Sequence, residues 1–235
     1  MSIRNPTENK YAEGQVILIN KALNWTSFDV VRKINRLLNG IKVGHAGTLD
    51  PLATGLLILC TGKFTKKIQE YMGMEKEYLG TFHIGATTPT YDLESEPANF
   101  KEISSVTESQ IRSAFERWTG EVMQIPPVHS AIKKGGRRAY EYARKGNEIV
   151  LAPRKILIRT FELREFRLPE ISFRVVCSTG TYIRSLAQDI GVELGCGAYL
   201  SSLCRSRIGT FELEQALSME EAEAQIRRDM TDQNG

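Results

Sequence analysis

The stretch Gly44-His-Ala-Gly-Thr-Leu-Asp-Pro-Leu-Ala-Thr-Gly55 runs directly into the apolar segment Leu56-Leu-Ile-Leu-Cys60. Its glycines and its proline predict a tight, irregular loop, and the short apolar segment predicts a buried strand. Loops of this kind on a rigid scaffold are where catalytic groups concentrate. Asp50 is the only carboxylate of the loop. Taken alone, the same residues fit an ordinary Asp-Pro turn equally well.

Helical and strand patterns alternate along the rest of the chain. Helical spacing predicts a helix capped by Ser27 and stopped by Gly40, with its apolar positions at Phe28, Val31, Ile34 and Leu38. Further helices are predicted after the capping box Thr107-x-x-Gln110, after Thr181, and along the stripe Phe64, Ile68 and Tyr71. Strands are predicted at 78–84, 156–168 and 171–178. Because no regular strand–helix–strand rhythm appears, we expect an α+β fold with a large, mostly antiparallel mixed sheet flanked by helices and loops.

Composition places the chain among globular proteins. Hydrophobic residues make up 41% and charged residues 25% of its 235 residues. The longest apolar run is far shorter than the ~20 residues that span a bilayer, and the first 14 residues lack the apolar core of a secretory signal. We therefore expect a cytoplasmic protein without membrane contact. We also expect one domain over 15–217, a flexible terminus over 1–14, and a short acidic segment and tail over 218–235.

The cysteines and glycines exclude two kinds of cofactor site. Cys60, Cys177, Cys196 and Cys204 include no C-x-x-C pair, so we expect reduced thiols in apolar or half-buried positions and no bound metal. The segment Gly55–Phe64 superficially resembles a phosphate-binding loop. However, six residues rather than four separate its glycines, and Phe64 replaces the hydroxyl that binds magnesium. No cofactor is expected.

Charge is unevenly distributed along the sequence. The net charge is only +3, but ten Lys and Arg residues stand against three Glu between Lys133 and Arg164. Such a segregated basic stretch can form a face that binds a polyanion. It can equally form a solvated loop and an exposed strand.

Two further segments could carry chemistry. Ser178-Thr-Gly-Thr-Tyr-Ile-Arg184 lies at a predicted strand-to-helix junction, where Tyr182 and Arg184 could both face a cleft. Lys76-Glu-Tyr78 lies at the head of a predicted strand, where Tyr78 could stack on a planar ligand. The ordinary alternatives are core packing for Tyr78 and Tyr182 and a surface ion pair for Arg184.

These segments occur together in a known order. Gly44-His-x-Gly-Thr-Leu-Asp-Pro-x-Ala-Thr-Gly55, Lys76-x-Tyr78, Gly180-Thr-Tyr-Ile-Arg184 and Leu203-x-Arg205 resemble the motifs of the tRNA pseudouridine synthase B (TruB) family. Trp25–Arg32 and Pro126–Lys133 are also similar to segments of that family. The resemblance covers about residues 16–215. It implies the pseudouridine synthase fold, with an active-site cleft across the sheet, and isomerisation of the T-loop uridine at position 55 of tRNA.

The resemblance also implies roles for single residues. Asp50 would be the essential carboxylate, either attacking C1′ as a nucleophile or removing the 2′ proton on the way to a glycal; the sequence leaves both open. Arg184 would orient Asp50, Tyr78 would stack on the base, and Tyr182 would handle the C5 proton. The target base must leave its stack to be reached. His45 would fill the space left by flipped nucleotides.

Binding residues follow from the same comparison. Leu203 would line the uracil pocket. Candidate contacts to RNA phosphates are Lys21, Lys63, Lys133, Arg137, Arg138 and Arg205, with Tyr140 and Tyr142 interleaved in the basic stretch.

The implied partner is the T-arm of tRNA, bound by a monomer without an obligate protein partner. We expect no C-terminal RNA-binding PUA domain of the kind that many family members carry. Two alternatives stay open: an inactive RNA-binding or RNA-folding protein on the same fold, and a pseudouridine synthase that acts on another RNA.

Overall fold

The computed structural model describes residues 9–130, 133–134, 137–138 and 151–232. The chain divides into two compact units, Met1–Lys76 with Cys204–Gly235, and Glu77–Leu203. Residues 15–217, expected to be one domain, are shared between the two units, because the chain leaves the first unit after Lys76 and returns to it at Cys204. No shift in composition marks either point.

Nine of the described strands form one sheet. Its order is β1-β3-β10-β4-β9-β8-β5, with β2 beside β3 and β11 beside β10. The pairs β1–β3, β2–β3, β5–β8, β8–β9 and β10–β11 are all antiparallel. The predicted large, mostly antiparallel sheet with flanking helices is confirmed.

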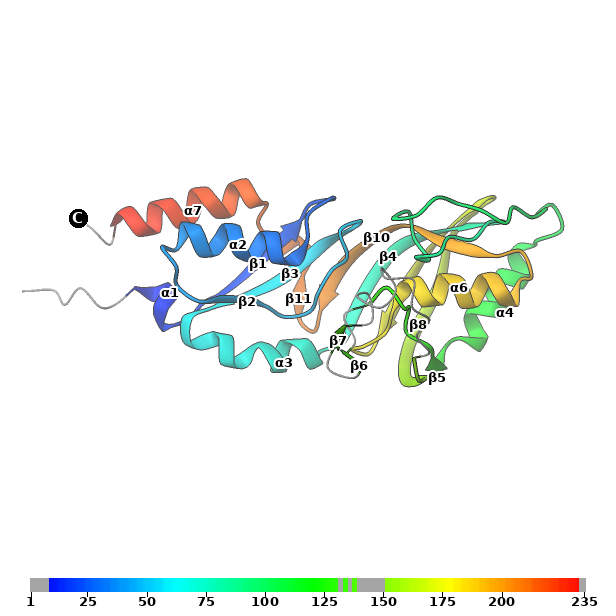
Figure 1. The fold of residues 1–235 in the computed structure, drawn as a ribbon, viewed down its shortest axis with the longest axis horizontal. Coiled ribbons are helices and arrows are strands. Elements are labelled where there is room, and N and C mark those ends of the chain that lie inside the picture. Colours follow the sequence, from blue (N-terminus) through cyan, green and yellow to red (C-terminus); the bar gives the residue numbers. More distant parts are fainter. Residues whose placement is uncertain (1–8, 131–132, 135–136, 139–150, 233–235) are drawn as a thin grey trace, which may run out of the picture. The chain divides into compact units, whose positions relative to one another are not determined.

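The first unit is built around strand β3 (Figure 1). Its strands are β1 (Val16–Lys21), β2 (Val43–His45), β3 (Ala53–Thr61), β11 (Phe211–Glu212) and the second half of β10 (Ala198–Ile208). Its helices are α1 (Lys10–Glu13), α2 (Ser27–Leu37), η1 (Gly62–Lys67), α3 (Ile68–Gly73), η2 (Leu213–Gln215) and α7 (Met219–Asp232).

Strand β3 is buried on both faces. Leu57 and Leu59 join a cluster with residues of α2 and α7, whereas Leu56, Ile58 and Cys60 join a cluster with residues of η1 and α3. A strand covered on both faces reads as a continuous apolar run rather than an alternating one. The prediction of a buried strand at 56–60 is confirmed.

Helix α2 forms where the apolar spacing predicts it, with two corrections. Thr26, not Ser27, is the N-cap: its side chain accepts from the amide of Asp29, and the Asp29 carboxylate closes a capping box. Ser27 is instead fully buried. Phe28 was expected on the core face but is 65% exposed, because the buried positions of the helix are Val30 and Ile34.

The two ends of the described chain also pack in the first unit. Residues 10–13, inside the terminus expected to be flexible, form α1, where Tyr11 is buried and its hydroxyl donates to Asp229 of α7 at 2.5 Å. Burial and that carboxylate raise the Tyr11 pKa. The segment expected to be a short acidic tail contributes Met219, Ala222 and Ile226 to the core.

The second unit contains β4 (Lys76–Ile84), β5 (Gly120–Gln124), β8 (Arg154–Arg167), β9 (Glu170–Cys177) and the first half of β10, with helices α4 (Glu108–Arg117) and α6 (Ile183–Glu193). The short strands β6 (Lys133–Lys134) and β7 (Arg137–Arg138) form a separate two-stranded pair. The predicted strands at 78–84, 156–168 and 171–178 and the Thr107–Gln110 capping box are confirmed. Helix α6 begins one residue later than expected, with Tyr182 rather than Thr181 as its N-cap.

Four phenylalanines form the core of the second unit. Phe82 of β4 stacks on Phe173 of β9 with ring centroids 4.1 Å apart, and Phe115 of α4 stacks on Phe161 of β8 at 3.8 Å. Phe82 meets Phe115 and Phe161 edge to face. The cluster joins one helix and three strands, and such aromatic pairs stabilise beyond the area that they bury.

Replacing Phe82 by alanine is expected to destabilise the second unit by about 3–5 kcal/mol, because its side chain is completely buried. Phe100→Ala is the matched control, since Phe100 is 76% exposed and its loss should cost less than about 0.5 kcal/mol. Denaturant unfolding followed by circular dichroism measures both. A loss below about 1 kcal/mol for Phe82→Ala would contradict the central role of this cluster.

Candidate active site

The loop that carries Asp50 joins β2 to β3 in the first unit, and its main chain is anchored just before Asp50. The buried Ser27 hydroxyl accepts from the Leu49 amide at 2.8 Å and donates to the Leu49 carbonyl at 3.2 Å. One side chain therefore satisfies both main-chain groups of the residue that precedes Asp50. Ser27 was predicted only as a helix cap, and sequence reasoning missed this role because the partner lies 22 residues away.

A second set of bonds anchors the loop just after Asp50. The Pro51 carbonyl accepts from the Asn24 amide at 2.9 Å and from Lys21 Nζ at 3.4 Å. The Asp50 carbonyl accepts from the Ala53 amide at 3.1 Å. Asn24 adopts a left-handed conformation with φ of 65°. The Asp50 main chain is thus held on both sides by β1, α2 and the loop between them.

Lys21 lies inside the first unit rather than on its surface. Its side chain is fully buried, and Nζ also donates to the carbonyls of Ala22 at 3.0 Å and Trp25 at 2.6 Å. Burial lowers the Lys21 pKa to about 8, and the nearby Asp50 carboxylate acts in the opposite direction. A fully buried ammonium does not reach an RNA phosphate at the surface, so the structure gives Lys21 a different place from the predicted one: it holds the Asp50 loop.

Arg205 is buried in the same way. Its Nε donates to the Leu56 carbonyl at 2.8 Å and its Nη2 to the Gly47 carbonyl at 3.1 Å. The predicted phosphate contact becomes a tie between β10, the start of β3 and the Asp50 loop. Gly55 permits this approach: its φ is +100°, and a Cβ there would lie 2.4 Å from the Arg205 carbonyl oxygen.

His45 stands at the end of β2, paired with Leu59 of β3. Burial lowers the His45 pKa, and the positive charge of Arg205 adds to the effect. Both effects favour the neutral form of the imidazole.

Arg184 lies in the first turn of α6 in the second unit and is 5% exposed. Its Nε lies 3.6 Å from an Asp92 carboxylate oxygen, and its other nitrogens donate to the carbonyls of Thr90 at 3.3 Å and His129 at 3.1 Å. Sequence reasoning missed Asp92 as the partner of Arg184. A local signal could not find the pair, because its members lie far apart in the sequence.

Tyr182 is fixed through its main chain. The buried Gln124 side chain accepts from the Tyr182 amide at 2.8 Å and donates from Nε2 to its carbonyl at 3.0 Å. Ser185 adds a bond to the Ile125 carbonyl at 2.8 Å. The start of α6 is thereby tied to the end of β5. Tyr78 is buried on β4, and Leu203 is half-buried on β10.

The remaining predicted phosphate contacts are less defined. Lys63 is exposed and pairs with Glu13 at 2.6 Å. Strand pairing joins Lys133 to Arg138 and Lys134 to Arg137, so four basic residues lie on one pair of short strands. Tyr140 and Tyr142 lie outside the described residues.

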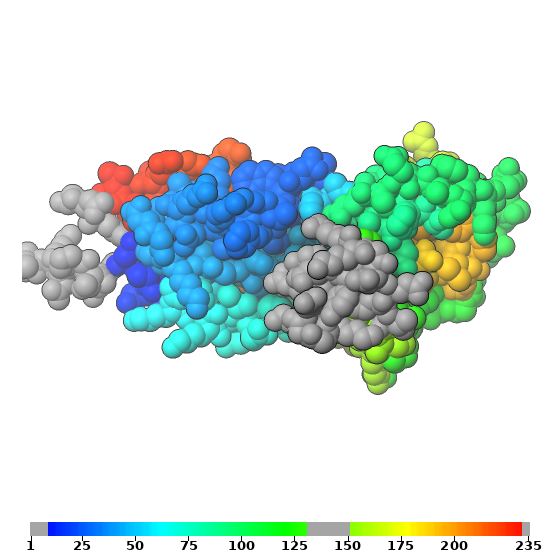
Figure 2. Space-filling model, in the orientation of Figure 1, coloured from blue at the N-terminus to red at the C-terminus, as the bar shows by residue number. Residues whose placement is uncertain are grey.

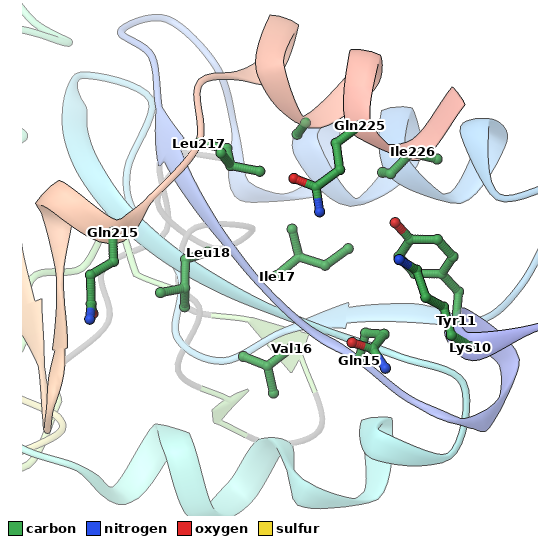
Figure 3. Close-up of a pocket in the computed structure, with 11 residues that line it drawn as sticks. Lys10, Tyr11, Gln15, Val16, Ile17, Leu18, Gln215, Leu217, Gln225 and Ile226 are labelled. Atoms are coloured by element: carbon green, nitrogen blue, oxygen red, sulfur yellow. The ribbon is translucent and has the colours of Figure 1, made fainter. Parts of the chain in front are cut away.

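Across the described ranges, no group of three or more His, Cys, Asp or Glu side chains could hold a metal ion, and no helix is long and apolar enough to cross a membrane. The four cysteines are free thiols, three of them buried and Cys204 half-buried, as predicted. A pocket of about 280 Å³ lies between α1, β1 and α7 (Figure 3). None of the predicted site residues lines it.

Family models match most of the chain. The model of the TruB family pseudouridylate synthase N-terminal domain matches residues 35–183, and that of the tRNA pseudouridylate synthase B C-terminal domain matches residues 184–234. The chain belongs to the TruB family. The border between the two matches falls inside α6, so it does not coincide with the limits of the compact units.

Curated TruB relatives are similar over nearly their whole length. The tRNA pseudouridine synthase B of Flavobacterium johnsoniae is 51% identical, over 91% of this chain and 96% of the relative. The tRNA pseudouridine synthase B of Phocaeicola vulgatus is 50% identical, over 89% of this chain and 92% of the relative. The tRNA pseudouridine synthase B of Opitutus terrae is 44% identical, over 89% of this chain and 87% of the relative.

Solved structures share the fold of this chain at lower sequence identity. A chain in the crystal structure of a Cbf5-Nop10-Gar1 complex superposes with a TM-score of 0.72 at 29% identity, over 93% of this chain. A chain in the structure of an H/ACA RNP bound to a substrate RNA containing 2′-deoxyuridine superposes with a TM-score of 0.70 at 27% identity, over 97% of this chain. This chain spans 59% of the length of each.

Asp189, on the same helix as Arg184, is expected to make stability depend on pH. Burial raises its pKa to about 7, and one carboxylate oxygen has no hydrogen-bond partner among the described residues. The ionised form is disfavoured in the folded state, so stability should fall as pH rises from about 4 to about 7 and stay reduced above that.

Asp189→Asn should therefore raise the melting temperature at pH 8 and change it little at pH 4. Each kcal/mol recovered corresponds to about 2–4 °C for a chain of this size. Glu116→Gln, at an exposed position of α4, is the control and should have little effect at either pH. An equal shift of the Asp189→Asn variant at both pH values would contradict the assignment.

Proposed function

We propose that this TruB-family protein isomerises the uridine at position 55 in the T-loop of tRNA to pseudouridine. The observation that carries the proposal is Asp50, a carboxylate in an irregular loop whose main chain is bonded on both sides by Ser27, Asn24 and Lys21. The names of the curated relatives support tRNA as the substrate.

The proposed reaction breaks the N1–C1′ bond, turns the uracil and forms a C5–C1′ bond. It is redox-neutral and consumes no second substrate, so the chain's own residues can supply its groups. Asp50 acts either as the nucleophile at C1′ or as the base that removes the 2′ proton. Both roles need a carboxylate held in a fixed place, since a displacement of about 1 Å can cost about 100-fold in rate.

Further roles are proposed for four residues of the second unit and for His45 of the first unit. Tyr78 stacks on the uracil, Tyr182 handles the C5 proton, and Leu203 lines the base pocket. Arg184 is the proposed electrostatic partner of Asp50, and its own position depends on Asp92 and on the carbonyls of Thr90 and His129. His45 fills the space that flipped nucleotides leave, since the target base must leave its stack.

Partners and location follow from this role. We propose that the protein acts in the cytoplasm on the tRNA T-arm, as a monomer and without an obligate protein partner. Lys63, Lys133, Arg137 and Arg138 stay as proposed phosphate contacts. Lys21 and Arg205 do not, because both are buried and bonded to main-chain carbonyls.

The direct test is incubation with an unmodified tRNA transcript, followed by pseudouridine mapping. Conversion at position 55 is expected. Conversion only at another uridine would contradict the T-loop assignment, and tRNA binding without any conversion would favour an inactive RNA-binding protein.

Asp50→Asn is expected to abolish turnover and to leave the Kd for tRNA within about tenfold, since binding rests mainly on phosphate contacts. Tritium release from C5-labelled uridine in tRNA measures turnover, and filter binding measures the Kd. Retained turnover would remove Asp50 from its proposed role.

Ser27→Ala is expected to leave both main-chain groups of Leu49 without their buried partner, at a cost of about 1–3 kcal/mol in stability. Because Leu49 adjoins Asp50, kcat should fall about 10- to 100-fold, with a smaller change in KM. Ser27→Thr keeps the hydroxyl and should recover most of the kcat. Equal kcat values for the alanine and threonine variants would contradict the positioning role.

A further inference from the structure

The outer side of α2 and the loop before it form a hollow of about 300 Å³ in the first unit. Asn24, Trp25, Asp29, Arg32, Lys33 and Arg36 line it. Residues three to four positions apart lie on one side of a helix. The residues from Asp29 to Arg36 in this set face away from the core positions Val30 and Ile34. We call these six residues, together with Phe28, the α2 face. Helix α2 belongs to the blue part of the surface in Figure 2.

The α2 face pairs aromatic rings with cations. The Arg32 guanidinium lies 5.8 Å from the centre of the Phe28 ring, and Lys33 Nζ lies 5.8 Å from the Trp25 ring. Phe28 is 65% exposed, so its ring is accessible to a ligand. Flat rings beside cations are the combination that binds single-stranded nucleic acid, by stacking on bases and attracting phosphates.

The cations of the α2 face are available to a polyanion. Arg32 pairs with Asp29 at 2.5 Å and Lys33 with Glu223 at 2.9 Å. Exposed pairs of this kind are worth only about 0–1 kcal/mol, so phosphate can replace the carboxylates. Arg36 is exposed and has no ion-pair partner in the described part of the chain. Protein–protein interfaces are depleted of charge at their centre, so three cations in the hollow favour RNA over a protein partner.

The α2 face is continuous with the Asp50 loop. Asn24 lines the hollow, while its amide donates to the carbonyl of Pro51, the residue after Asp50. The main chain of Asn24 is therefore bonded to the loop that holds the proposed catalytic carboxylate. An RNA whose uridine reaches Asp50 has neighbouring nucleotides that must cross the surface of the first unit nearby.

We propose that the α2 face binds the substrate RNA beside the reacting uridine, with Phe28 and Trp25 stacking on an unpaired base and Arg32 and Arg36 contacting phosphates. This inference rests on the proposed RNA-modifying function and extends its binding surface to a part of the chain outside the basic stretch 133–164.

The test compares two charge reversals of equal size. R32E/R36E removes two cations from the α2 face, and R112E/R228E removes two exposed arginines from α4 and α7. At about 100 mM salt, R32E/R36E should raise the Kd for an unmodified tRNA transcript at least about tenfold, and the control by less than about threefold. The slope of log Kd against log salt should fall by about 1–2 in R32E/R36E alone, as expected for the loss of two phosphate contacts.

Phe28→Ala separates stacking from charge. It should raise the Kd several-fold and leave the salt slope unchanged, because a stacked base releases no counterions. Melting temperatures of all variants show whether they fold, and the exposed positions changed here should tolerate the substitutions.

Equal Kd values for R32E/R36E and R112E/R228E would overturn the proposal, as would an unchanged Kd for Phe28→Ala together with an unchanged salt slope for R32E/R36E. Pseudouridine mapping with the wild-type protein tests the proposed function separately. Wild-type protein that binds tRNA without converting it would overturn the proposed function, while the comparison of Kd values would still decide the α2 face.

Discussion

The arrangement of the first unit depends on buried polar side chains that bond to main-chain groups of one loop. Lys21, Arg205 and Ser27 all reach this loop or the start of β3, and all three are buried. Burying a polar group costs free energy unless the group is hydrogen-bonded, so each of these side chains must be buried together with its main-chain partners. The loop that holds Asp50 is therefore bonded at several points although it is neither helix nor strand.

The second unit uses the same device at the start of α6. Gln124 bonds both main-chain groups of Tyr182, and Asp92 faces Arg184 in a site shielded from water. Removing one partner of such a buried charge pair costs more than the pair itself contributes. The proposed catalytic residues of both units are thus held by neighbours that carry out no chemistry themselves.

Local rules predicted much of the fold. The apolar segment 56–60, the spacing of the α2 core and the Thr107 capping box follow from patterns within a few residues, and all three are confirmed. The same rules placed the N-caps of α2 and α6 one residue away from their observed positions, because a cap depends on backbone geometry that several neighbouring residues could adopt. They also put Phe28 in the core, although its side chain is exposed. The exposure of Phe28 became informative only once α2 and its hollow were described.

The sequence by itself determined the family, the elements and the candidate residues Asp50, Tyr78, Tyr182 and Arg184, because these lie in contiguous motifs. Only the tertiary structure decided what holds them. The partners Ser27–Leu49, Arg205–Gly47 and Arg184–Asp92 are far apart along the chain, and a bond between such residues leaves no local pattern. Lys21 and Arg205 were predicted to contact RNA, but both are buried and bond to main-chain carbonyls inside the first unit. The sequence could not show this, since exposure is a property of packing and not of residue type.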